Sequence, residues 1–171
     1  MELVEAQFSI DGRGSQTYYT VRTFRSMWIW NMTVPLIRGL RHLALRVTDL
    51  GRSRAFYEGV FGMKVVWEPD PDNVYVSSGT DNLALHQIPR EELAQYATQR
   101  GQFLDHFGMI MDTPESVDQM FDQVHKEAER FGGAIVHQPK RHRDSSYSFY
   151  VADPDGNTIQ VLYEPTISQK D

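Results

Sequence analysis

The chain has 171 residues, of which 40% are hydrophobic and 23% charged, a composition typical of a globular domain with a sizeable core. Its 23 acidic and 17 basic residues give a formal net charge of −6, which disfavours binding to nucleic acid or an anionic membrane and favours a small-molecule partner. The absence of cysteine excludes disulfides, thiolate metal sites and a cysteine nucleophile.

Residues 1–34 have a different pattern from the rest of the chain. They include Trp28 and Trp30 in a loosely alternating aromatic stretch. Three interpretations are open: an arm that packs on a neighbouring subunit, an extra edge hairpin, or an extension upstream of a start at Met32. We favour the arm or the extension, and exposed aromatic surface of this kind favours a homodimer. The start of the chain does not resemble a signal peptide and no apolar run could span a membrane, so we expect a cytoplasmic protein.

The next segment has the periodicity of one structural unit. A strand, an amphipathic helix, three further strands and a polar connecting helix are predicted over residues 40–47, 53–61, 63–68, 73–78, 82–87 and 89–99. Asp49 or Ser53 can cap the amphipathic helix, and Gly62 can end it. The turn formed by residues 79–81 separates the last two strands.

The second half of the chain has the same order of elements. A strand, a helix and three strands are predicted over residues 104–111, 114–132, 134–138, 146–152 and 157–164. Thr113 and Pro114 open the helix, whose apolar stripe is formed by Val117, Met120, Phe121 and Val124. Residues 153–156 (DPDG) have the composition of a tight hairpin turn.

The two halves are an internal repeat. HLALRV aligns with HFGMIM, which places His42 opposite His106, and FGMKVV aligns with GGAIV after a helix of comparable length. Two βαβββ units of this kind usually pair about a pseudo-twofold axis, so the two histidines should face each other. The predicted organisation is therefore an extension (1–34), one α+β domain (39–165) and a tail (166–171). Within the domain we expect unit one (39–88), a linker helix (89–101) and unit two (102–165).

Three stretches, at residues 42–66, 104–111 and 148–165, together resemble the vicinal oxygen chelate superfamily. This group includes glyoxalase I, bleomycin-resistance proteins, fosfomycin-resistance enzymes, methylmalonyl-CoA epimerase and extradiol dioxygenases. The resemblance implies tandem βαβββ units that form an open, cup-shaped mixed sheet. It also implies metal ligands on the first and last strand of each unit.

Carried over by position, the resemblance makes His42 and His106 ligands of a divalent metal ion, with Fe, Mn, Ni and Zn all open. A lone histidine on an apolar strand is as readily a core residue, but two at matched positions favour ligands. Gln160 stands where the family usually has glutamate; its amide oxygen can coordinate a metal, but it has no charge and cannot act as a general base. Ala84 occupies the fourth position. His86 shares its strand face and is a pocket candidate, with a solvated or core-edge histidine as the alternative.

Two further residues are catalytic candidates. Tyr150 falls where ring-cleaving dioxygenases have an active-site tyrosine, with core packing as the alternative, and Ser145 stands where those enzymes have an additional catalytic histidine. Arg46 lies four residues after His42 on the same predicted strand, so the two side chains should point to the same face. It either clamps a substrate carboxylate, as its counterpart does for glutathione in glyoxalase I, or forms a salt bridge at the sheet edge.

Two charged features are assigned to the surface. Glu164 lies about 13 Å along the strand from Gln160, too far to replace it as a ligand. The run of residues 140–143 (KRHR) is interpreted as a solvated loop rather than an anion-steering lip.

Two functions remain open. The first is a divalent-metal-dependent enzyme of isomerase, lyase or dioxygenase type that acts on a small molecule with neighbouring oxygen atoms, which the paired histidines favour. The second is a metal-free protein that binds or sequesters a small molecule, as bleomycin-resistance proteins do, which Gln160 and Ala84 favour. A nucleophile elbow, a phosphate-binding glycine loop and an HExxH zinc helix are absent from the sequence.

Overall fold

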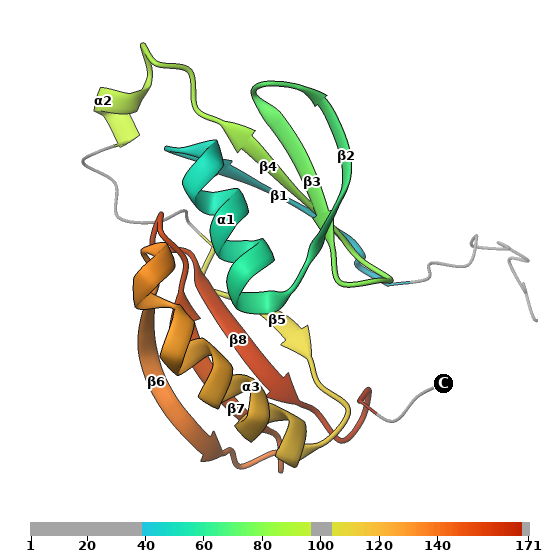
Figure 1. Ribbon diagram of the computed structural model, residues 1–171. Coiled ribbons are helices and arrows are strands. Elements are labelled where there is room, and N and C mark those ends of the chain that lie inside the picture. Colours follow the sequence, from blue (N-terminus) through green and yellow to red (C-terminus); the bar gives the residue numbers. More distant parts are fainter. Residues whose placement is uncertain (1–38, 97–103, 169–171) are drawn as a thin grey trace, which may run out of the picture. The chain divides into compact units, whose positions relative to one another are not determined.

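The computed structural model describes residues 39–96 and 104–168, which belong to one compact unit, Gly39–Asp171 (Figure 1). The aromatic segment predicted as an arm or extension lies outside the described residues. Within them, no helix is both long and apolar enough to cross a membrane.

Each half of the unit contains a strand, a helix and three strands, as the sequence predicts. The elements of the first half are β1 (His42–Val47), α1 (Leu50–Phe61), β2 (Lys64–Asp70), β3 (Asn73–Ser77) and β4 (Asn82–Gln87). A short helix, α2 (Leu93–Tyr96), follows. The elements of the second half are β5 (Phe107–Ile110), α3 (Pro114–Glu127), the 3-10 turn η1 (Glu129–Phe131), β6 (Ala134–Arg141), β7 (Tyr147–Ala152) and β8 (Thr158–Tyr163).

The strands form two four-stranded mixed sheets, in the orders β1-β4-β3-β2 and β5-β8-β7-β6. In each sheet the first and last strands of the repeat are parallel, and the remaining pairs are antiparallel. The predicted α+β fold with tandem βαβββ units is confirmed. The registers also correspond: Tyr75 lies opposite Ala84 in the first sheet, and Tyr150 lies opposite Gln160 in the second.

The helix boundaries follow from their caps. The Asp49 side chain accepts a hydrogen bond from the Arg52 backbone N–H at 2.9 Å, so α1 begins earlier than predicted, at Leu50. Gly62 ends the helix in the left-handed conformation, with φ of 66°. Thr113 caps α3, with Pro114 in its first turn.

One prediction about the second sheet is wrong in part. Residues 140–143 were expected in a loop, but Lys140 and Arg141 belong to β6, where they pair with Ser148 and Tyr147, and only His142 and Arg143 lie beyond the strand. This strand is exposed along most of its length, so its sequence lacks the apolar alternation that marks a half-buried strand.

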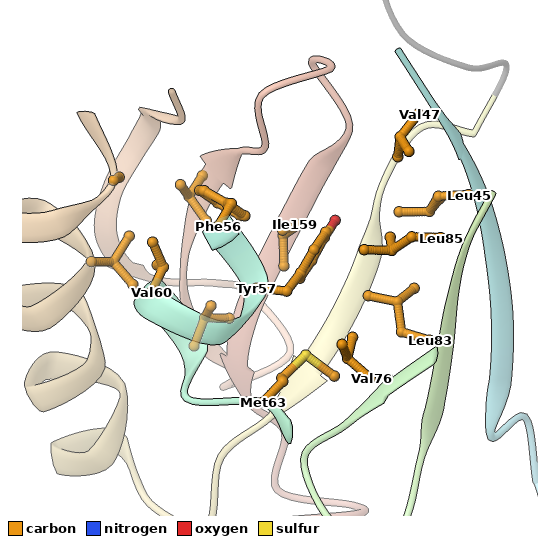
Figure 2. Close-up of a cluster of buried hydrophobic side chains, with 14 of the residues drawn as sticks. Leu45, Val47, Phe56, Tyr57, Val60, Met63, Val76, Leu83, Leu85 and Ile159 are labelled. Atoms are coloured by element: carbon orange, nitrogen blue, oxygen red, sulfur yellow. The ribbon is translucent and has the colours of Figure 1, made fainter. Parts of the chain in front are cut away.

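One hydrophobic core is shared by both halves, and helices α1 and α3 pack against their sheets. Figure 2 shows Phe56 and Tyr57 of α1 in the same cluster as Leu83 and Leu85 of β4 and Ile159 of β8. The opposite face of β1, which includes Ala44 and Arg46, is exposed.

A buried polar cluster joins α1 to the turn between β7 and β8. The Tyr57 hydroxyl donates to Asp153 at 2.8 Å, and the Ser53 hydroxyl donates to Asp155 at 2.9 Å. Asp153 also accepts hydrogen bonds from the Asp155 and Asn157 backbone N–H groups and from the Asn157 side chain. Burial raises the pKa of the Asp153 carboxyl, and burial together with that carboxyl raises the pKa of Tyr57 well above its ordinary value.

Candidate functional site

A pocket of about 410 Å³ lies where the starts of β1 and β5 approach each other. His42, His106 and Gln160, the three predicted metal ligands, all line it. They come from β1, from the residue before β5, and from β8. The rest of the wall is mainly apolar, with Leu40, Leu43, Met63, Leu83, Leu104, Phe107, Gly108 and Met109, together with Arg41, Asp81 and Asn82.

Both histidine rings are oriented by a hydrogen bond from Nδ1. In His42, Nδ1 lies 2.6 Å from the side-chain oxygen of Asn82, and in His106 it lies 2.9 Å from a carboxylate oxygen of Asp105. These oxygens are acceptors, so the ring proton sits on Nδ1 and the lone pair is on Nε2. Among the described residues, neither Nε2 has a hydrogen-bond partner. Metal-binding histidines usually have this arrangement.

The third donor is an amide. The side-chain nitrogen of Gln160 donates to the Ser148 hydroxyl at 3.0 Å, which leaves its oxygen as the atom available to a cation. Within the described part of the chain, no three His, Asp or Glu side chains are grouped so that they could hold a metal ion. Two imidazoles and an amide oxygen fit a divalent cation, but they offer it no negative charge.

Two predicted pocket residues do not line this pocket. Ala84 is fully buried, and Tyr75 lies beside it on β3. His86 is half-buried; its Nδ1 pairs with the Asn73 side chain and its ring stands edge-on to Tyr75 at 5.9 Å. His42 contacts the other side of this neighbourhood, since its ring stacks on Tyr75 with 6.5 Å between centroids, but neither Ala84 nor His86 lines the pocket with His42 and His106.

Tyr150 lies beside the candidate ligands without lining the pocket. Its ring contacts His106 edge-to-face, with 5.6 Å between ring centroids. His137 and His142 contact the same ring at 5.4 and 6.5 Å. Sequence reasoning proposed neither of these histidines as a site residue. His137 falls on the predicted strand 134–138, so its place on β6, next to β7, could have identified it. His142 lies just after β6, where no strand pattern predicts its position.

Arg46 is engaged at the edge of the first sheet. Its guanidinium forms an ion pair with Glu92 at 2.6 Å and donates a hydrogen bond to the Tyr96 hydroxyl at 2.5 Å. Arg46 does not line the pocket. Of the two interpretations of Arg46, a clamp for a substrate carboxylate or a salt bridge at the sheet edge, the ion pair with Glu92 matches the second.

Comparison with known proteins identifies relatives of this fold. The family model described as Glyoxalase/Bleomycin resistance protein/Dioxygenase superfamily matches residues 39–161. The metallothiol transferase FosB of Lysinibacillus sphaericus (strain C3-41) is 28% identical over 127 residues, which cover 72% of this chain and 81% of that protein. The trivalent organoarsenical cleaving enzyme of Bacillus sp. (strain MD1) is 28% identical over 130 residues, 73% of each chain.

Solved structures agree with the topology. The crystal structure of lactoylglutathione lyase from Agrobacterium tumefaciens has a TM-score of 0.59 at 24% sequence identity. The similarity covers 77% of this chain and 98% of that chain. At this identity the comparison supports the fold alone.

Proposed function

This chain belongs to the Glyoxalase/Bleomycin resistance protein/Dioxygenase superfamily, and from this premise we propose that it is a divalent-metal-dependent enzyme acting on a small molecule with neighbouring oxygen atoms. The observation that supports this proposal is the pocket lined by His42, His106 and Gln160, with both Nε2 atoms available. A divalent ion bound there would supply Lewis-acid polarisation of two adjacent substrate oxygens.

The residues of this chain have distinct proposed tasks. His42 and His106 hold the cation, and Asn82 and Asp105 fix the orientation of their rings. Gln160 contributes an oxygen but cannot accept a substrate proton near neutral pH. Tyr150, whose ring packs edge-to-face against His106 without lining the pocket, is proposed to support the orientation of that imidazole. These proposed tasks are compatible with a lyase, an isomerase or a dioxygenase reaction.

The chemistry of the donor atoms favours an oxygen-rich substrate. The arsenical-cleaving relative acts on trivalent arsenic by name, and FosB is named for thiol transfer. Trivalent arsenic is a soft acceptor that thiolates bind best, and this chain has no cysteine to supply one. We therefore favour a substrate that presents vicinal oxygens to the two imidazoles.

A second candidate is a metal-free binding protein. It is favoured by the uncharged donor set and by the mainly apolar wall of the pocket. In this case His42 and His106 would donate or accept hydrogen bonds with a sequestered ligand instead of holding a cation.

Metal titration separates the two candidates. We expect the chelator-treated protein to bind one equivalent of Mn(II), Fe(II), Ni(II) or Zn(II) per chain in calorimetric titrations, with Fe(II) handled anaerobically. His42→Ala and His106→Ala should abolish binding, because each removes one of two nitrogen donors. His125→Ala is the matched control, because His125 stacks on Phe121 on the exposed side of α3. Absence of binding by the parent chain would favour the binding-protein alternative.

A further inference from the structure

We propose that His142 is a positioning residue, which acts through Ser148 to turn the Gln160 amide oxygen toward the pocket. The inference rests on the proposed metal-binding function. Ser148 is fully buried on β7, and its hydroxyl oxygen lies 2.7 Å from Nε2 of His142 and 3.0 Å from the side-chain nitrogen of Gln160. The three side chains form one hydrogen-bonded chain.

The Ser148 hydroxyl can donate only one of its two hydrogen bonds, and this determines which atoms donate and which accept along the series His142, Ser148 and Gln160. A serine hydroxyl has one proton to donate and two lone pairs that accept. When Nε2 of His142 accepts a hydrogen bond from the Ser148 hydroxyl, the serine oxygen has only a lone pair to offer to the side chain of Gln160. The amide then presents its NH₂ group to Ser148 and its oxygen to the other side. The oxygen is the amide atom that binds a cation, so this orientation is the competent one.

Without the imidazole, the orientation of the amide is no longer fixed. The Ser148 hydroxyl is then free to donate to the oxygen of Gln160, which turns the NH₂ group toward the pocket. An NH₂ group has no lone pair for a cation. A glutamate at this position would need no such selection, because its two oxygens are equivalent. The positioning residue is therefore a consequence of having Gln160 in this position.

The hairpin between β6 and β7 holds His142 in place. The backbone N–H of His142 donates to the carbonyl of Ser146 at 2.9 Å, and Ser145 has a left-handed φ of 72°. The Asp144 carboxylate accepts hydrogen bonds from the backbone N–H and the hydroxyl of Ser146, at 3.0 and 2.7 Å. These contacts define the turn from which the imidazole reaches Ser148.

Within residues 39–96 and 104–168, the first half has no equivalent chain of hydrogen bonds that leads to the position of Gln160. By register, Asn73 on β3 corresponds to Ser148, since the two face His86 and Leu162 respectively. Asn73 pairs with His86, and the residue equivalent to Gln160 is Ala84, which has no polar group. The arrangement around Ser148 is therefore specific to the half that carries the amide.

The test measures metal affinity directly, with Mn(II), Ni(II) and Zn(II) each titrated alone into the metal-free full chain. We expect His142→Phe and Ser148→Ala each to weaken binding by roughly 10-fold, the usual cost of losing a residue that orients a ligand. His137→Phe is the matched control: it removes an imidazole that also flanks Tyr150 but has no hydrogen bond to Ser148. Thermal unfolding of the metal-free variants identifies any that do not fold.

A second pair of variants distinguishes positioning from a general structural effect. In a Gln160→Glu background, His142→Phe should leave the affinity unchanged, because either carboxylate oxygen can bind. Equal losses in both backgrounds, or parent-like affinity of both His142→Phe and Ser148→Ala, would overturn the inference while leaving the proposed function in place. Failure of the parent to bind any of the three ions would overturn the proposed function, and the inference with it.

Discussion

The sheet faces of the two halves share a register but differ in chemistry. In the first half Trp67 lies beside Tyr75, which lies beside Ala84; in the second, His137, Tyr150 and Gln160 hold the corresponding positions. The tyrosines on the third strands match, as do His42 and His106. The flanking positions carry an indole and a methyl group in one half, and an imidazole and an amide in the other. The two halves therefore share one strand register, but polar side chains flank the central tyrosine only in the second half, where they are His137 and Gln160.

The turns before the last strands provide the largest expected difference between the halves. Asp153 accepts four hydrogen bonds and is 2% exposed, whereas Asp81 accepts from the Ser78 N–H and hydroxyl in an exposed turn. We expect Asp153→Ala to lower the free energy of unfolding by about 3 kcal/mol, because buried donors lose their acceptor. Asp81→Ala should cost about 1 kcal/mol or less. Urea denaturation of both variants measures the difference, and equal costs would contradict it.

A carboxylate introduced into the last strands should act oppositely in the two halves. We expect Gln160→Glu to tighten binding of a divalent ion by roughly 10-fold or more, because it adds a negative charge beside the cation. Ala84→Glu should instead destabilise the fold, because Ala84 is fully buried and does not line the pocket. Calorimetric titration and thermal unfolding check the two effects. Unchanged affinity in Gln160→Glu would remove Gln160 from the set of ligands.

The pH dependence of stability should also distinguish the two turns. Since burial raises the pKa of Asp153, its contribution to stability is fully present below the unfolded-state pKa of about 3.9 and is lost as pH rises through the folded-state value. Asp153→Asn removes this titration. From about pH 4 upward, the stability of the parent relative to this variant should fall. Asp81→Asn is the control, and the same trend in that comparison would show that Asp153 is not its source.

The smallest expected effect concerns the ion pair on the first half. Arg46 and Glu92 side chains are 45% and 39% exposed, and the position equivalent to Arg46 in β5 is the apolar Ile110. We expect Arg46→Ala to cost about 0.5 kcal/mol of stability and to leave metal affinity unchanged. A large loss of turnover on a carboxylate substrate, with metal affinity retained, would instead support the substrate clamp.

Local patterns were sufficient to predict most of the fold. The caps at Thr113 and Gly62 and the alternation of the strands depend on neighbouring residues, so one sequence contains that information. The repeat then related His42 to His106, which do line one pocket.

Contacts between strands could not be predicted in the same way. Alternation tells which face a side chain occupies but not which residue on the next strand it meets. For this reason the link from Gln160 through Ser148 to His142 became visible only in the structure. The ion pair of Arg46 with Glu92 likewise depends on where the linker folds back.

The buried contacts of Tyr57 and Ser53 with the β7–β8 turn also make the two halves non-interchangeable. Two copies of the first half would meet a different acceptor at this place, because the Asp81 carboxylate lies in an exposed turn and accepts hydrogen bonds from the N–H and hydroxyl of Ser78. Pairing of the first half with a second copy of itself is thereby disfavoured.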